Sequence, residues 1–373
     1  MLSVVQENKV NFFDTTNFKE FADNLGDTFN NISICLPLYR SQLCLLVGNR
    51  GNENFPYDQV SLWDFSREKI IAKIKIKFDD ENDEREKIYK LYANCKALFV
   101  VLRHKIILFN IITLKYITTF EDVDGNESHI SFGSTRESNL TPHIVLVYVS
   151  NLNHKLIKIN KINFDFTTSE GVILYSQHTL STDFESIQFL SVSSRNKFLA
   201  VVSEGGEKIN IYSLRTYKAR KYLWRGYAKV IITNVIFDRE DKFLCLLSSQ
   251  KTFHIYPLLR KYLNPKAAKN PNNVNDNEDD DQDYYNYGRR KPNKFKKMFK
   301  SIRKELGRKY KDSFAKYKDE KVLVNPIKFF YFNNAMDLIV FDETGRVLII
   351  KFNKKKGGMC WLHQTKYLEV REF

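Results

Sequence analysis

The sequence has few of the features that would assign it to a secreted, membrane-spanning or disulfide-bonded class. Its five cysteines are odd in number and scattered through apolar runs, which excludes a disulfide framework and a CxxC metal site. No run approaches the roughly 18 consecutive apolar residues of a membrane span, and residues 1–50 have no basic head followed by an apolar signal segment. We therefore expect a cytoplasmic protein with reduced thiols.

Motifs that carry catalysis are also absent. HExxH, GxSxG, GxxxxGK[ST] and GxGxxG do not occur, and the seven histidines do not form a group with ligand spacing. The glycine pairs at 205–206 and 357–358 lie in hairpin-like contexts, where glycine supplies turn geometry. The sequence thus makes no positive case for an enzyme, a metal site or a cofactor.

What is present is a large apolar fraction and a net positive charge that is concentrated in one segment. The 373 residues are 43% hydrophobic, enough to bury a sizeable core, and the formal net charge is +15. Residues 289–311 hold 12 lysines or arginines and one acid, so this segment carries +11 of the total. An Asn/Pro-rich stretch (264–275) and an acidic run (276–283) precede it. We interpret residues 259–311 as a solvated insertion.

The basic segment also has an apolar stripe at helical spacing. Its members are Phe295, Met298, Phe299, Ile302 and Leu306, with Tyr310 beyond. The spacing predicts an amphipathic helix over 293–306 whose other faces are basic, a pattern typical of contact with an anionic membrane surface. A nucleic-acid or nuclear-import segment and a merely solvated charge run are the alternatives.

The remaining chain reads as short strands with one recurring signature. Segments 9–13, 59–63, 105–109, 155–159, 208–212, 252–256 and 346–350 share a polar start and an apolar, often aromatic, end. They are 44–53 residues apart, except for one spacing of 94 that becomes about 41 without the insertion. Asp14, Asp64 and Asn110 follow three of them, close to a WD-type ending.

Seven such repeats predict an all-β fold, a seven-bladed β-propeller formed by residues 1–373 as one domain with a long loop in blade six. A β-sandwich array is the alternative. The first repeat aligns from its second strand. Three explanations are open for this short first blade: the ring closes imperfectly, a C-terminal strand supplies the missing one, or the start of the chain is incomplete.

The tetrapeptide Leu-Trp-Arg-Gly at 223–226 resembles the Phe/Leu-Arg-Arg-Gly motif of the PROPPIN family, the phosphoinositide-binding seven-bladed propellers of autophagy. The similarity extends to LLVG at 45–48 with VSLWD at 60–64, to KTFHIY at 251–256 and to KGGMC at 356–360. It also includes SFAKY at 313–317, which resembles the strand that closes the family's sixth blade. The insertion falls where the family carries its membrane-inserting loop.

The resemblance implies two headgroup pockets, one for each arginine of the motif. Arg225, Ser248, Thr252 and His254 match the second pocket, and arginine grips phosphate through paired hydrogen bonds. The first pocket is degenerate: only two of its positions match, and Trp224, Glu207 and Asn210 replace two cations and add an anion. The residues at these first-pocket positions are His178, Ser203, Glu207, Asn210 and Trp224. We therefore expect one lipid site and a stronger reliance on the insertion.

The resulting hypothesis is a monomeric, non-enzymatic propeller that binds phosphatidylinositol 3-phosphate, and also the 3,5-bisphosphate, on autophagic or endolysosomal membranes. Residues 54–58 match a family loop that contacts an autophagy lipid-transfer protein, so such a partner is expected. The alternative is a propeller scaffold that has lost phosphoinositide recognition and acts through proteins alone. A nucleic-acid partner is the least favoured option.

Overall fold

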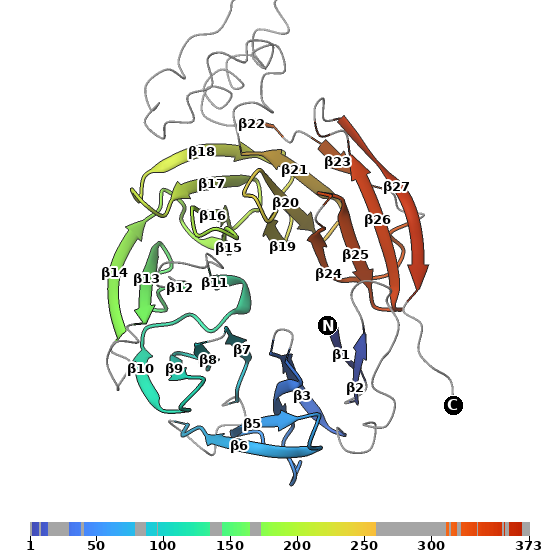
Figure 1. The fold of residues 1–373 in the computed structure, drawn as a ribbon. Helices are drawn as coiled ribbons and strands as arrows, with labels where there is room; N and C mark the ends of the chain where they lie inside the picture. Colours follow the sequence, from blue (N-terminus) through green and yellow to red (C-terminus); the bar gives the residue numbers. More distant parts are fainter. Residues whose placement is uncertain are drawn as a thin grey trace, which may run out of the picture.

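The computed structural model describes residues 2–6, 9–13, 30–38, 41–78, 87–94, 96–134, 144–164, 173–258, 311–312, 315–318, 322–333, 335–352, 354 and 358–367. Within these ranges the regular structure is β-strand, apart from one 3-10 helix, η1 (Glu127–His129). Figure 1 shows small sheets arranged in chain order around a ring. The predicted all-β propeller is confirmed.

In the described ranges, six sheets have four antiparallel strands, and we number them two to seven after a two-stranded first sheet. The first sheet contains β1 (Leu2–Gln6) and β2 (Lys9–Phe13). The second and third contain β3 (Ile32–Pro37), β4 (Leu43–Gly48), β5 (Gln59–Asp64), β6 (Lys69–Lys75), β7 (Lys90–Ala93), β8 (Ala97–Val101), β9 (Ile106–Asn110) and β10 (Tyr116–Phe120). The fourth and fifth contain β11 (Ile130–Ser134), β12 (Ile144–Val149), β13 (Leu156–Phe164), β14 (Ile173–Ser181), β15 (Ile187–Val192), β16 (Phe198–Ser203), β17 (Lys208–Ser213) and β18 (Ala219–Trp224). The sixth and seventh contain β19 (Ile232–Phe237), β20 (Phe243–Ser248), β21 (Phe253–Pro257), β23 (Ala315–Tyr317), β24 (Ile327–Phe332), β25 (Leu338–Asp342), β26 (Arg346–Phe352) and β27 (Gly358–Tyr367).

The recurring signature marks one position in every four-stranded sheet. The six signatures after the first coincide with β5, β9, β13, β17, β21 and β26, each of them the third strand of its sheet. The acid or amide after the signature closes the next turn: Asp64 accepts hydrogen bonds from the N–H and hydroxyl of Ser66, and Asn110 accepts from the N–H groups of Ile112 and Thr113. Asp14 lies outside the described residues.

The core lies between successive sheets, because both faces of the middle strands are covered. The second strands are continuous apolar runs, such as the fully buried β12 and β20, whereas the outer strand β6 alternates exposed lysines with inward residues. Separate buried clusters join sheets two and three, three and four, four and five, five and six, and six and seven. This packing fixes which face of each strand meets the next sheet.

Around the join between sheets one and seven, the described structure holds two strands of the first sheet. In Figure 1 the hairpin β1–β2 lies between β3 and the seventh sheet, and β27 pairs with β26 as the outer strand of that sheet. A parallel pairing of β23 with β27 links the sixth and seventh sheets, and β22 (Lys311–Asp312) extends the fifth sheet beside β18.

The insertion separates β21 from its sheet partner β23 along the chain. Residues 259–310 lie outside the described residues, and with them the predicted helix over 293–306 and its stripe of Phe295, Met298, Phe299, Ile302 and Leu306. The predicted closing strand at 313–317 is confirmed as β23, which pairs antiparallel with β21.

Candidate functional site

The motif at the end of β18 directs its two central side chains to opposite sides of the fifth sheet. Leu223 packs in the core that joins the fifth and sixth sheets. Because side chains alternate along a strand, Trp224 faces the fourth sheet and Arg225 faces the sixth. The sequence-predicted residues therefore divide into two groups on two sides of one sheet.

The backbone of the fifth sheet holds Arg225 in place. Its main-chain N–H donates to the Glu207 carbonyl at 2.9 Å, its Nε donates to the Gly206 carbonyl at 2.7 Å, and its Nη2 donates to the Ala228 carbonyl. The side chain is half-buried, and this burial lowers its pKa, opposed by Tyr256 and Glu207 nearby. A guanidinium has five N–H donors, so three are without a partner among the described residues.

A glycine makes this tether possible. Gly206 has a φ of +65°, and a Cβ at this position would lie 2.4 Å from the Val230 carbonyl oxygen. The chain here is further closed by the Val230 N–H, which donates to the Gly205 carbonyl at 3.0 Å. Only glycine fits both the backbone conformation and the close approach.

The other three predicted residues of the second pocket lie on the face of the sixth sheet that meets Arg225. Leu246 and Tyr256 on this sheet belong to the core shared with the fifth sheet, and His254 pairs with Leu246 across β20 and β21. Alternation places Ser248, Thr252 and His254 on the same face. We call Arg225, Ser248, Thr252 and His254 the Arg225 cluster.

Three members of the Arg225 cluster are buried. Ser248, Thr252 and His254 are 3%, 4% and 2% exposed. The Ser248 hydroxyl donates to the Thr252 carbonyl at 3.5 Å, and the Thr252 hydroxyl donates to the Gln250 carbonyl at 3.4 Å, both long for hydroxyl donors. Arg225 is thus the accessible member, and the two hydroxyls are held weakly within their own turn.

His254 is a neutral imidazole at physiological pH. Burial, reinforced by the positive charges of Lys316 and Arg225, lowers the pKa of His254 to about 3. Its Nδ1 has no hydrogen-bond partner among the described residues, although the side chain is buried. A neutral imidazole beside two cations can donate one N–H to an anion without adding a charge of its own.

Two neighbours of the cluster were missed by sequence reasoning. Lys316 on β23 is the direct cross-strand partner of His254 and is exposed, and the Tyr256 hydroxyl donates to the Trp224 carbonyl at 3.1 Å. Lys316 lies within the matched segment 313–317, but its register against His254 depends on a pairing across the insertion. The alternation of polar residues on β21 is the signal that could have identified Tyr256.

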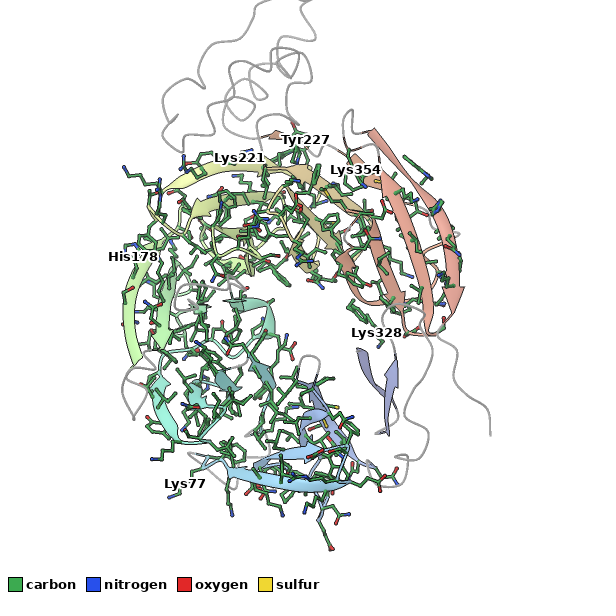
Figure 2. All side chains as sticks on the ribbon, viewed as in Figure 1. Lys77, His178, Lys221, Tyr227, Lys328 and Lys354 are labelled. Carbon is green, nitrogen blue, oxygen red and sulfur yellow. The ribbon has the colours of Figure 1, made fainter. Side chains whose placement is uncertain are left out.

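The residues predicted for the degenerate first pocket make other contacts. The His178 ring stacks on Tyr217 with centroids 3.7 Å apart, and Lys161 Nζ lies 4.7 Å from the same tyrosine ring. Asn210 is 1% exposed and its Nδ2 donates to the Tyr212 hydroxyl at 3.3 Å. Figure 2 shows His178 on the outer edge of the fourth sheet.

The side chains at the remaining first-pocket positions also contact neighbouring residues. The Ser203 hydroxyl accepts a hydrogen bond from the Lys208 N–H at 3.2 Å, the Trp224 ring packs edge-on to Tyr227 at 5.2 Å, and Glu207 lies close enough to Arg225 to raise the pKa of that arginine. None of the five predicted side chains is a permanent cation.

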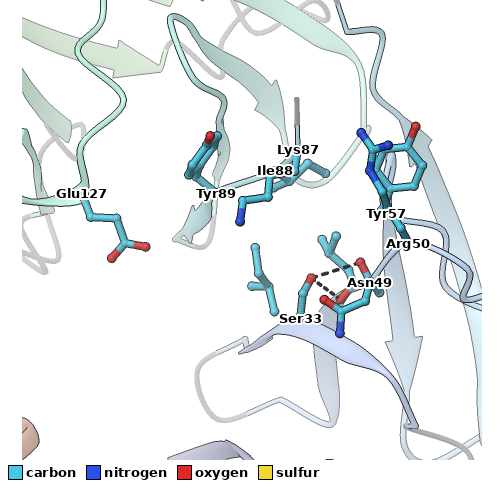
Figure 3. Close-up of a pocket in the computed structure, with 11 residues that line it drawn as sticks. Ser33, Asn49, Arg50, Tyr57, Lys87, Ile88, Tyr89 and Glu127 are labelled. Atoms are coloured by element: carbon cyan, nitrogen blue, oxygen red, sulfur yellow. Dashed lines mark hydrogen bonds between the residues drawn. The ribbon is translucent and has the colours of Figure 1, made fainter. Parts of the chain in front are cut away.

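The loop at 54–58 borders a cavity between the second and third sheets. Phe55 is 2% exposed and meets Trp63 edge-on, and Tyr57 stacks on Phe78, so the loop packs onto its own sheet. Tyr57 also helps to line a cavity of about 500 Å³, where the Arg50 guanidinium lies 4.7 Å from the tyrosine ring centroid. Figure 3 shows this cavity with Ser33, Lys87, Tyr89 and Glu127 around it.

In the described ranges, no group of three or more His, Cys, Asp or Glu side chains could hold a metal ion. None of the helices there has the length and apolarity needed to cross a membrane.

Known proteins resemble the chain in sequence and in fold. No protein-family model matches it. SVP1-like protein 2 of Pichia angusta is 21% identical over 241 residues, which is 65% of this chain and 62% of that protein. WD repeat domain phosphoinositide-interacting protein 1 of Homo sapiens is 25% identical over 178 residues, 46% of this chain and 36% of that protein. Other relatives carry the name Autophagy-related protein 18.

The chain therefore spans less than two thirds of these relatives. Among solved structures, Kluyveromyces lactis Hsv2 has a similar fold, with a TM-score of 0.67, 11% sequence identity, and coverage of 98% of this chain and 95% of that one. These relatives bear out the resemblance to the PROPPIN family, and the solved structure shows that the chain shares the propeller fold.

Proposed function

We propose that this protein is a non-enzymatic phosphoinositide-binding propeller that acts at autophagic or endolysosomal membranes. Its ligand is phosphatidylinositol 3-phosphate, or the related 3,5-bisphosphate, held at the Arg225 cluster. The observation that carries the proposal is the placement of Arg225, partly exposed and with unpaired N–H donors, against a buried neutral histidine and an exposed lysine.

This arrangement suits a phosphate monoester. The backbone carbonyls of Gly206 and Ala228 fix the guanidinium, so its remaining donors present a preformed fork to phosphate oxygens. Lys316 adds a second positive charge, and His254 adds a neutral N–H donor. The name of the human relative, which describes a phosphoinositide-interacting protein, supports the same ligand class.

We expect one lipid site and not two, because the first-pocket positions on the other side of the fifth sheet are unsuited to an anionic headgroup. The first-pocket positions hold no permanent cation, and His178 is stacked between sheets on Tyr217. The insertion residues Phe295, Met298, Phe299, Ile302 and Leu306 would supply a second, lipid-inserting contact, with lysines around them attracting anionic lipid. Two weak membrane contacts on one molecule give avidity that neither has alone.

A protein partner belongs to the same proposal. The loop at 54–58 and the neighbouring cavity of about 500 Å³ offer a surface away from the Arg225 cluster. An autophagy lipid-transfer protein that contacts this surface would be brought to the membrane that the cluster binds. Loss of binding on Tyr57→Ala, with vesicle binding retained, is the expected result of a pull-down with such a partner.

Vesicle flotation tests the lipid proposal directly. Wild type binds vesicles that contain phosphatidylinositol 3-phosphate better than vesicles with equal charge as phosphatidylserine, and Arg225→Ala removes that preference. Arg225→Lys keeps the charge but loses the fork, and so recovers only part of it. Arg67→Ala, which removes one exposed cation from the turn after β5, is the matched control and binds as wild type.

The second candidate function is a protein scaffold without lipid recognition, which the cavity beside Tyr57 favours. Equal binding to the two vesicle types, or an Arg225→Ala variant that binds as wild type, would establish this candidate and reject the lipid proposal.

A further inference from the structure

The loop that follows Arg225 exposes large apolar side chains in a fixed conformation. Tyr227 is 67% exposed and Ile231 is 63% exposed, both between β18 and β19. Exposed apolar side chains that gather on one surface mark sites of protein or membrane contact.

Hydrogen bonds order this loop and join it to its neighbours. The Val230 N–H donates to the Gly205 carbonyl, and the Ser249 N–H donates to the Ile231 carbonyl at 2.8 Å. Lys251, in the same turn as Ser249, donates through Nζ to the carbonyl of Val324, which is 59% exposed. Tyr227, Ile231 and Val324 thus lie on successive, bonded loops, and we call these three residues the apolar strip.

The position of the strip relates it to the headgroup site. Trp224, at the end of β18, packs edge-on to Tyr227, and Arg225 lies between these two rings in sequence. Figure 2 shows Tyr227 at the outer edge of the ring. The charged residues that the structure describes on the strip's own loops are basic, Arg225, Lys229, Lys251 and Lys318, with Glu204 and Glu207 on the adjoining turn of the fifth sheet; Asp319, Glu320 and Lys321 of the Val324 loop lie outside the described residues.

We propose that the apolar strip is an interfacial anchor that enters the headgroup region of an anionic bilayer beside the phosphoinositide at Arg225. Tyrosine and tryptophan favour the boundary between water and hydrocarbon because the ring is apolar and its polar atom keeps a water or headgroup contact. Lysines flanking such a contact are attracted to anionic lipid. The replacement of the family's first arginine by Trp224 then exchanges a headgroup contact for a lipid-boundary contact.

This inference rests on the proposed function for the orientation of the molecule, but it predicts a different signature. Removing Tyr227 or Ile231 lowers affinity for vesicles with and without phosphatidylinositol 3-phosphate by the same factor. We expect roughly fivefold to twentyfold for each alanine variant, as for the loss of much of one buried apolar side chain. Arg225→Ala changes the preference between the two vesicles instead.

Matched controls exist on the third sheet. Tyr116 is 60% exposed and Ile112 is 68% exposed, and both lie far along the ring from the fifth sheet (Figure 1). Tyr116→Ala and Ile112→Ala leave vesicle affinity unchanged. Equal thermal melting of all four variants shows that each is folded.

Tryptophan fluorescence gives a second, direct readout. Of the three tryptophans, Trp63 is buried and Trp224 is half-buried against Tyr227, so after Trp361→Phe removes the exposed one, quenching by lipid reports on Trp224 beside the strip. In that background, doxyl-labelled lipid in phosphatidylcholine and phosphatidylserine vesicles quenches Trp224 emission on binding.

The outcomes separate the two proposals. Vesicle affinity unchanged by Tyr227→Ala, or Trp224 emission that doxyl lipid does not quench, overturns the anchor and leaves the Arg225 site standing if the phosphoinositide preference persists. Quenching and Tyr227 dependence without any phosphoinositide preference sustain the anchor and reject the headgroup site.

Discussion

The buried histidine of the Arg225 cluster gives a quantitative prediction for stability against pH. The pKa of His254 is about 3 in the folded protein and about 6.5 in an unfolded chain. Above pH 6.5 both states hold a neutral imidazole, so the histidine imposes no pH dependence there. Below that value the unfolded state takes up a proton that the folded state excludes, and stability falls until the folded pKa is reached.

The magnitude follows from the difference between the two pKa values. At pH 5 the pH lies about 1.5 units below the pKa of the imidazole in the unfolded chain, which is then almost fully protonated. His254 alone therefore lowers the free energy of unfolding by about 2 kcal/mol relative to pH 7. His254→Gln keeps a polar side chain of similar size but has no proton to gain. The variant therefore loses about 2 kcal/mol less than wild type between pH 7 and pH 5.

Urea denaturation at pH 7, 6 and 5 measures this difference. His104→Gln, which removes an exposed histidine from the turn between β8 and β9, is the control and keeps the wild-type pH dependence. A soluble headgroup such as inositol 1,3-bisphosphate, bound at Arg225, offsets the nearby positive charges and raises the pKa of His254. Equal pH dependence in wild type and His254→Gln would refute the burial of a neutral imidazole beside two cations.

Three shorter predictions concern the neighbours of the cluster. Lys316→Met weakens binding to phosphatidylinositol 3-phosphate vesicles about fivefold, as for one charge near a membrane surface, and it raises the pKa of His254 in an NMR titration. Gly206→Ala destabilises the protein by about 1–3 kcal/mol in thermal denaturation, because the new Cβ meets the Val230 carbonyl in a left-handed backbone. Tyr217→Ala releases the His178 ring and costs about 1 kcal/mol of stability, while vesicle binding stays as in wild type; a loss of lipid binding would restore a role for the first pocket.

Much of the fold could be predicted from sequence because propeller sheets repeat locally. The strand signatures could be recognised from the sequence, since a polar start, an apolar end and a capping Asp64 or Asn110 depend only on neighbours in the chain. The strand that closes the sixth sheet, β23, was also predicted, from a matched segment and not from periodicity, and in the structure it pairs with β21. The described residues form six four-stranded sheets and one two-stranded sheet.

Other parts of the site required contacts between sheets. Glu207 was matched to the first pocket from the sequence, and that assignment stays a prediction; in the structure its carbonyl accepts from the Arg225 N–H and its carboxylate raises the pKa of that arginine. Lys316 could not be placed from the sequence, because its register opposite His254 is fixed by a strand that follows the insertion. Both contacts arise from strand pairing and not from spacing along the chain.

The sequence by itself determined the class of fold, the position of the insertion and the asymmetry between Arg225 and Trp224, because repeats, charge runs and residue identity are properties of the chain. Only the tertiary structure decided that these two residues face different sheets, that His254 is neutral and that Tyr227 lies exposed on the loop whose Ala228 carbonyl accepts from the Arg225 guanidinium. Burial and electrostatic coupling arise where one sheet packs on the next, and that packing joins residues that are remote in the chain.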